Sequence, residues 1–259
     1  MGSDILSKVR KLNWVLQESA NGVFSFDELC NILSDLMDSN VYIANKKGKV
    51  IGVHYKIRRD SATIKDSETG SEKFPNEYNE ALLKVLETEA NLQAEDALKI
   101  FKYDYDTSEK LHTVVPILGG GQRLGTLVLT RYSPEFIDED LVLAEYGATV
   151  IGLEIQKQKS LELEEDQRNS SVVQMAIGTL SYSEVEAVQQ IFNELGGLEG
   201  FLVASKIADR SSITRSVIVN ALRKLESAGI IESRSLGMKG THIKVLNNKL
   251  LDELEKLKS

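Results

Sequence analysis

The segment of residues 204–245 constrains the fold most, because two helical patterns are followed there by two β-rich runs. Thr214 is placed to cap the second helix, and Gly229 marks its end. Residues 230–234 and 241–245, rich in β-formers, then make a hairpin. The face of the second helix that is expected to be buried consists of Ile218, Ala221, Leu222 and Leu225. Helix, turn, helix and hairpin in this order predict a winged helix-turn-helix.

The charge of this module differs in sign from that of the rest of the chain. Eight lysines and arginines against three acidic residues give residues 201–245 a net charge of +5. Since the whole chain carries −8, the remainder carries −13, so only this module suits a phosphate backbone. We expect it to bind duplex DNA through the outer face of the second helix and the hairpin. The predicted contacts are Ser205, Lys206, Arg215, Ser216, Asn220, Arg223, Arg234, Lys239 and Lys244. The alternative is a winged helix that contacts only other proteins.

The part of the chain before residue 138 mixes helical and β patterns. Helices are expected over residues 5–17 and from Ser25, which fits a capping box with Glu28. Residues 41–53 and 112–131 are each expected to form a hairpin, the second around a glycine-rich loop. Paired hairpins with flanking helices predict an α+β fold with a central antiparallel sheet.

A long helix is expected to begin at Asp138, with an apolar stripe that repeats every three or four residues. Residues 156–168 are highly charged, which predicts an exposed helical linker, and a further helix is expected to run to about Leu180. Ser183 and Glu186 fit another capping box at the start of the next helix. The expected parts are an α+β domain of residues 1–155, a linker of residues 156–180 and a winged helix of residues 181–259.

Composition and motifs disfavour a membrane protein and an enzyme. The apolar runs are only a few residues long, and the chain opens on an amphipathic helix instead of a signal segment. The single cysteine, Cys30, excludes an internal disulfide, so a cytoplasmic location is expected. The three histidines lack the paired spacing of metal ligands, so no metal site is expected. The sequence contains no serine elbow and no carboxylate pair, so neither catalysis nor a catalytic cofactor is expected. Residues 119–125 are rich in glycine but lack the Lys-Ser/Thr of a P-loop.

The amino-acid sequences of several segments closely resemble those of the CodY family of nutritional repressors of low-GC Gram-positive bacteria. The matching segments are residues 116–121, 123–127, 143–150, 204–229 and 235–241. The resemblance implies a GAF-like sensor domain, a long linker helix, a winged helix-turn-helix and a homodimer. It also implies that branched-chain amino acids (isoleucine above all, with valine and leucine) and in many members GTP raise the affinity for AT-rich operators.

The same resemblance assigns residues to the amino-acid pocket. The family lines this pocket with a Phe-Pro-x-x-Tyr motif, and an upstream arginine holds the carboxylate of the ligand. The corresponding residues here are Phe74, Pro75 and Tyr78, with Lys99 and Phe101 further along and either Arg59 or Arg58 as the arginine. Aromatic walls suit an aliphatic side chain, and a guanidinium offers two donors to a carboxylate. Taken without the family, Phe74 and Tyr78 fit ordinary core packing better.

Family members that bind nucleotide hold it between the first hairpin and the linker helix. The matching positions here are Asn45, Lys46, Lys47, Lys49, Glu154 and Lys159. Lysines replace arginines of the family at the turn, so the charge is kept while the bidentate donor fork is lost. We therefore expect a global transcriptional regulator, mainly a repressor, whose DNA affinity rises with isoleucine and, where this site functions, with GTP. The alternatives are a ligand-independent protein–protein interaction module and a sensor of a purine nucleotide alone.

Overall fold

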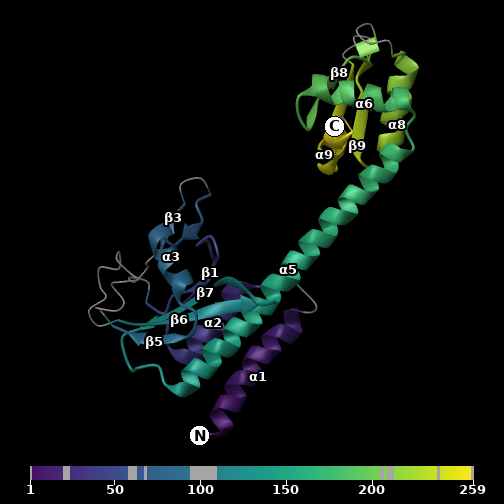
Figure 1. Cartoon of the computed structure of the whole chain (residues 1–259). Helices are drawn as coiled ribbons and strands as arrows, with labels where there is room; N and C mark the ends of the chain where they lie inside the picture. Colours follow the sequence, from purple (N-terminus) through teal and green to yellow (C-terminus); the bar gives the residue numbers. More distant parts are fainter. Residues whose placement is uncertain are drawn as a thin grey trace. The chain divides into compact units, whose positions relative to one another are not determined.

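The computed structural model describes residues 2–19, 24–57, 63–66, 69–93, 110–204, 207–208, 213–237 and 240–257. The chain divides into two compact units, Met1–Lys159 and Ser160–Ser259. The boundary lies inside α5 (Asp138–Gly178), a single helix of 41 residues (Figure 1). The prediction of a separate helix near residues 172–180 is wrong, because no proline interrupts the charged stretch and the helix continues through it. The domain boundaries at residues 155 and 180 stay a prediction.

The first unit is built around a five-stranded antiparallel sheet. Its order is β2-β1-β7-β6-β5, so each predicted hairpin is present and the two hairpins meet along β1 and β7. The strands are β1 (Asn40–Asn45), β2 (Val50–His54), β5 (Glu89–Leu92), β6 (Leu111–Gly119) and β7 (Gln122–Arg131). β6 and β7 are joined at Gly120 and Gly121, whose φ angles of 57° and 72° favour glycine. β5 lies at one edge and has no counterpart among the predicted strands.

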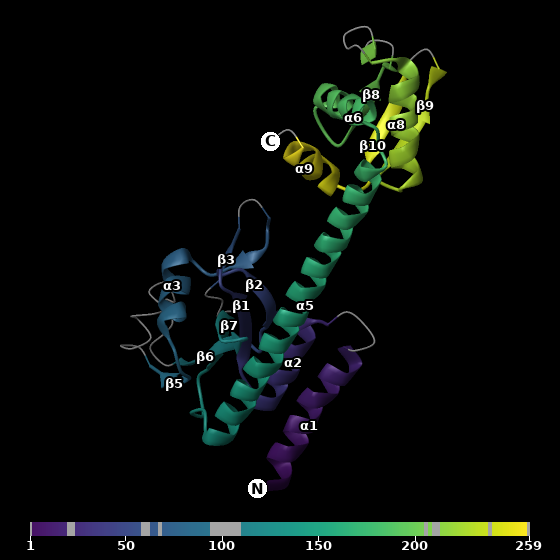
Figure 2. The ribbon, with the colours of Figure 1, turned by 45° about the vertical axis from the view of Figure 1, so that its right-hand side comes forward.

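Helices cover one face of this sheet (Figure 2), and the larger of the two hydrophobic clusters of the unit lies between them and the sheet. α1 (Gly2–Ser19) and α2 (Phe26–Met37) lie there beside the first half of α5. Ser25 caps α2 as predicted, since its hydroxyl accepts from the Glu28 amide at 3.2 Å. The core between the helices and the sheet includes Leu29, Leu33, Val41, Ile43, Leu127, Leu129, Leu143 and Ile151.

The opposite face of the sheet carries a second, smaller cluster of buried side chains. α3 (Asn76–Lys84) packs here, and the short pair β3 (Ile64–Lys65) and β4 (Glu72–Lys73) precedes it in the chain. Side chains alternate along β1, so Val41 and Ile43 face the helices while Tyr42 and Ala44 face α3. The cluster consists of Tyr42, Ala44, Phe74, Tyr78, Leu82, Val85, Val114 and Val128.

α5 begins beside a buried ion pair between Arg131, the last residue of β7, and Asp140. Arg131 Nη2 lies 2.6 Å from Asp140 Oδ2, and the two side chains are 7% and 10% exposed. The Asp140 carboxylate also accepts from the Ile137 amide at 3.2 Å. The remaining donors of the guanidinium reach the main-chain oxygens of Met37, Pro134 and Glu135. The start of α5 is thereby fixed to β7 and to the end of α2.

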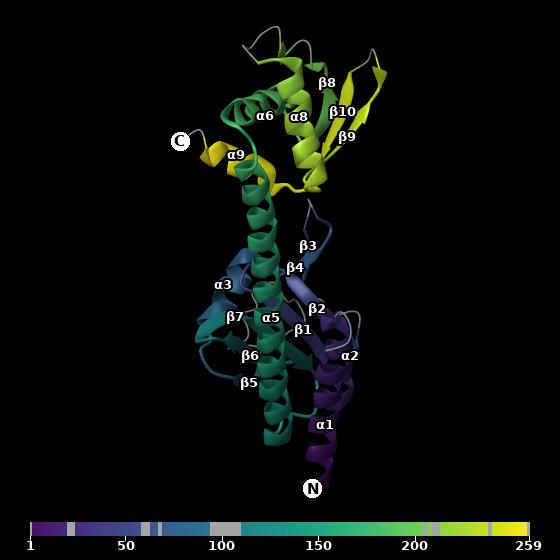
Figure 3. The same ribbon diagram turned by 90° about the vertical axis from the view of Figure 1, so that its right-hand side faces the viewer.

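The second unit contains the predicted winged helix-turn-helix (Figure 3). Among its described residues beyond the end of α5, the helices are α6 (Tyr182–Leu195), α8 (Arg215–Ser227) and α9 (Lys249–Lys256). Most of the predicted first helix of the motif, residues 204–210, lies outside the described residues. Its three-stranded sheet has the order β8-β10-β9, with strands β8 (Glu199–Leu202), β9 (Ile231–Ser235) and β10 (Thr241–Val245). β8 and α9 are elements that the sequence patterns did not predict.

The N-terminus of α6 differs from the sequence prediction by two residues. The capping box is formed by Ser181 and Glu184, in place of Ser183 and Glu186. Both pairs have the required spacing, but only Glu184 is also held by Lys224, whose Nζ lies 2.7 Å from its carboxylate. This contact lowers the pKa of Glu184, with a further contribution from the Ser181 amide. Tertiary structure therefore selects one of two equivalent local patterns.

Candidate ligand-binding and DNA-binding sites

Four aromatic side chains form a cluster on the α3 face of the first unit, which we call the aromatic cluster: Tyr42, Tyr55, Phe74 and Tyr78. The rings of Phe74 and Tyr78 lie 4.9 Å apart between centroids, and Phe74 is only 1% exposed. Tyr42 lies between this pair and Tyr55, with its ring centroid 6.0 Å from that of Phe74 and 5.5 Å from that of Tyr55. Edge and tilted contacts of this kind create a broad apolar wall. Tyr42 and Tyr55 were not among the predicted site residues, although the alternation along β1 places Tyr42 opposite Ile43.

A row of buried polar side chains crosses the sheet on the same face as the aromatic cluster. Asn40, Thr130 and His112 are neighbours in register across β1, β7 and β6. The amide oxygen of Asn40 accepts from the main-chain amides of Lys56 and Ile57 at 2.7 and 3.0 Å. Among the described residues, Thr130 Oγ1 has no hydrogen-bond partner. An apolar wall next to a polar row suits a ligand that has both kinds of surface.

Polar contacts hold α3 to the sheet at both of its ends. Before its first turn, the Phe74 amide donates to Gly48 O at 2.9 Å. At its C-terminal end, Arg123 donates from Nη1 to Val85 O at 2.5 Å and from Nη2 to Leu82 O at 3.2 Å. A cation at these carbonyls also complements the helix dipole, although burial lowers the pKa of Arg123. Tyr78 is thus carried by a helix with two fixed ends.

The predicted nucleotide residues of the first hairpin form a compact turn, residues 45–49, which we call the lysine turn. Asn45 Oδ1 accepts from the amides of Lys47 and Lys49 at 2.9 and 3.1 Å, and Gly48 has a φ of 77°. Lys46, Lys47 and Lys49 are exposed. Among the described residues, no ion pair joins these lysines to a carboxylate.

The two predicted nucleotide residues on α5 have different surroundings. Glu154 is 6% exposed, and its Oε2 lies 3.6 Å from Lys157 Nζ, whereas Lys159 is exposed. Within the described part of the chain, no ion pair or hydrogen bond links either residue to the lysine turn. The predicted amino-acid residues Arg58, Arg59, Lys99 and Phe101 lie outside the described residues.

Helix α8 has the two faces that its sequence predicts. Ile218, Leu222 and Leu225 are buried in the core of the second unit. The opposite face exposes the side chains of Arg215, Ser216, Asn220 and Arg223. Thr214 is the N-cap residue, but its hydroxyl pairs with that of Ser216 at 2.9 Å and leaves the helix amides uncapped. Free amides at a helix N-terminus attract phosphate.

The hairpin of the winged helix adds two exposed cations, Arg234 on β9 and Lys244 on β10. In the described part of the second unit, neither of them forms an ion pair, and the same holds for Arg215 and Arg223. Lys224 differs, because it is held by Glu184. The predicted DNA contacts Ser205, Lys206 and Lys239 lie outside the described residues.

Comparison with known proteins identifies both units. The model of the CodY GAF-like domain matches residues 4–179, and that of the CodY helix-turn-helix domain matches residues 198–258. The chain belongs to the CodY family. The Global transcriptional regulator CodY of Thermoanaerobacter sp. (strain X514) is 58% identical over 256 residues, which cover 99% of each chain. That of Clostridium kluyveri (strain NBRC 12016) is 55% identical over 258 residues, which cover 99% of this chain and all of the relative.

A solved structure supports the assignment of the first unit. The cofactor-binding GAF domain of the nutrient sensor CodY from Clostridium difficile is 52% identical and superposes with a TM-score of 0.50. The match covers 60% of this chain and 99% of that domain. As a CodY family member, the protein is a transcriptional regulator with a GAF ligand-binding domain and a helix-turn-helix DNA-binding domain. Transcriptional regulators are not an enzyme class, and neither family model indicates catalysis. No helix among the described residues is long and apolar enough to cross a membrane.

Proposed function

We propose that branched-chain amino acids, isoleucine above all with valine and leucine, bind at the aromatic cluster and raise the affinity for DNA. The observation that carries this proposal is the adjacency of the aromatic cluster to Asn40. Asn40 fixes Lys56 and Ile57, which directly precede Arg58 and Arg59 in the chain. The arginine at one of these two positions would hold the carboxylate, while Phe74, Pro75, Tyr78, Lys99 and Phe101 would surround the rest of the ligand.

For GTP, we propose the lysine turn as the phosphate-binding element. Lys46, Lys47 and Lys49 are exposed and have no carboxylate partner among the described residues, so their ammonium groups are available to a triphosphate. Asn45 is used by the turn itself, so its role would be to shape the loop. Glu154 and Lys159 complete this proposal as residues of α5 that would meet the remainder of the nucleotide.

For DNA, we propose that the N-terminal half of α8 enters the major groove and that the hairpin follows the backbone. Arg215, Ser216 and Asn220 offer donors and acceptors to base edges, while Arg223, Arg234 and Lys244 suit phosphates. Ser205, Lys206 and Lys239 would contact the same duplex. AT-rich operators fit this proposal if Arg234 of the hairpin also reaches the adjacent minor groove, which is narrow in such sequences and attracts arginine. A regulator that binds genomic DNA acts in the cytoplasm of a bacterium.

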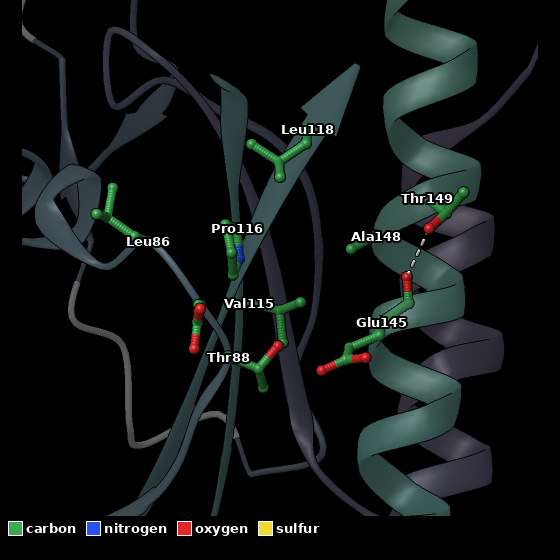
Figure 4. A pocket seen from close by; sticks show the side chains of 9 residues that line it. Leu86, Thr88, Val115, Pro116, Leu118, Glu145, Ala148 and Thr149 are labelled. Atoms are coloured by element: carbon green, nitrogen blue, oxygen red, sulfur yellow. Dashed lines mark hydrogen bonds between the residues drawn. The ribbon is translucent and has the colours of Figure 1, made fainter. Parts of the chain in front are cut away.

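We also propose that the protein acts as a homodimer through an apolar surface of the first unit. Leu118 on β6 and Val142 and Leu153 on α5 are each at least half exposed. Leu118 lines a groove of about 390 Å³ whose other walls come from residues 86–88, β6 and α5 (Figure 4). Val142 and Leu153 share the helix face of Glu145 and Thr149, so the surface is continuous along α5. Exposed apolar patches of this kind mark protein interfaces.

The test is operator binding by the full chain at one fixed salt concentration, with and without isoleucine and GTP. We expect isoleucine to lower the Kd for an AT-rich operator by at least fivefold, with alanine as a control amino acid that has no effect. If neither isoleucine nor GTP changes the Kd, the proposed sensor function is wrong. Sedimentation of the protein at the same concentrations tests the dimer separately, and a monomeric Leu153→Lys variant would identify the interface.

A further inference from the structure

The lysine turn and the aromatic cluster are physically connected. The amide of Phe74, a member of the cluster, donates to Gly48 O of the turn at 2.9 Å. From the first half of α3, Asn79 Nδ2 donates to Lys46 O, also at 2.9 Å. Both acceptors are main-chain oxygens, so a change in the backbone of the turn changes both hydrogen bonds.

The side chain of Asn79 is a buried amide, which is unusual on the inner face of a helix. It is 7% exposed, and its Oδ1 has no hydrogen-bond partner among the described residues. A buried acceptor without a partner lowers stability, so an apolar side chain would suit helix packing at this position better. The amide is thus used on its donor side alone, toward the lysine turn.

The packing between Asn79 and the turn is close. A Cβ atom added at Gly48 would lie 3.1 Å from both Cβ and Cγ of Asn79, and the φ of 77° at Gly48 is itself suited to glycine. The far end of α3 is held by Arg123. With that end fixed, a displacement of the turn tilts the first half of α3, which carries Tyr78.

We propose that Asn79 is a positioning residue that couples the lysine turn to the aromatic cluster. The inference rests on the proposed function, in which the cluster receives the amino acid and the turn receives an anion. A ligand that reshapes the turn then alters the affinity at the cluster, and the reverse effect has the same size. If the turn were only a hairpin loop, the two places would respond independently.

The experiment is a double-mutant cycle on the full chain, with the Kd for isoleucine measured by calorimetry. Gly48→Ala perturbs the turn, and Asn79→Ala removes the side-chain connection to α3 while the bond from the Phe74 amide to Gly48 O remains. The double variant completes the cycle. We expect Gly48→Ala to weaken isoleucine binding about fivefold in the native background and less than twofold in the Asn79→Ala background. Glu80→Ala, at an exposed neighbouring position of α3, is the matched control and should leave the effect of Gly48→Ala unchanged.

Thermal melting of all variants separates coupling from misfolding. If Gly48→Ala does not fold, Asn45→Ala replaces it, because this change removes the acceptor of the Lys47 and Lys49 amides. Equal effects of the turn variant in both backgrounds would overturn the coupling and leave the amino-acid site intact. If isoleucine does not bind the native protein, the proposed function fails instead. The coupling is then tested without ligand, by NMR. The turn variant should shift the amide signals of α3 in the native background, and Asn79→Ala should abolish these shifts.

Discussion

The buried pair of Arg131 and Asp140 allows a quantitative prediction for the anchoring of α5. Asp140→Asn keeps the shape of the side chain and one acceptor but removes the charge that compensates Arg131. Both side chains are at most 10% exposed, so the guanidinium would remain buried without its counter-ion. Removing one partner of a buried pair costs about 3–5 kcal/mol. Since the main-chain oxygens around Arg131 and one acceptor of the new amide remain, we expect about 3 kcal/mol.

Trp14 makes this loss measurable in the first unit alone. It is the only tryptophan of the chain and lies in α1, so the change of its fluorescence in urea follows the unfolding of that unit. For a unit of this size, 3 kcal/mol corresponds to a fall in Tm of about 6–12 °C. The matched control is Asp138→Asn, which removes an exposed acidic group from the same first turn and should cost less than about 0.5 kcal/mol. If both variants lose less than about 1 kcal/mol, the ion pair does not anchor the helix and the argument is refuted.

Three further predictions concern the candidate sites and the second unit. Arg215→Ala should weaken operator binding by about 5- to 150-fold in a gel-shift titration and leave isoleucine affinity unchanged, and equal loss of both would indicate misfolding. Phe74→Leu keeps an apolar side chain but removes a ring contact, so calorimetry should show isoleucine binding weakened about 2- to 10-fold, with DNA binding in the absence of ligand retained. Because Lys224 lowers the pKa of Glu184, the stabilisation is complete above the unfolded pKa and is lost as the pH falls through the lower folded value. Urea titrations between pH 5 and 3 should therefore show a steeper loss of stability for the native protein than for Glu184→Gln, and parallel curves would contradict this.

The elements predicted well from the sequence are those whose pattern is local and long. In α8, apolar residues at helical spacing identify Ile218, Leu222 and Leu225 as buried, and their burial is confirmed. The first hairpin is equally clear, because β-branched runs flank a turn that needs glycine at position 48. Short elements without such a pattern, such as β5 and β8, depend on pairing with a distant strand and are not visible locally.

The contacts that organise the aromatic cluster could not be predicted from the sequence for a related reason. Asn79 and Lys46 are 33 residues apart, and Arg123 and Val85 are 38 residues apart. No spacing rule relates residues at such separations, and each donor is of a type that usually faces solvent. The resemblance to the family therefore assigned the wall residues Phe74 and Tyr78, while the residues that hold α3 in place required the fold.

The continuity of α5 constrains how ligand binding in the first unit can affect the second. The first half of the helix packs in the core of the first unit through Leu143 and Ile151, and its last turns pack in the core of the second through Val173 and Ile177. All 41 residues of α5 are helical, so the helix itself runs without a break from one unit into the other. A ligand can shift DNA affinity only through contacts that differ between two states. Within the first unit, the contacts available for that purpose are those by which the sheet holds the first turn of α5, above all the ion pair of Arg131 and Asp140.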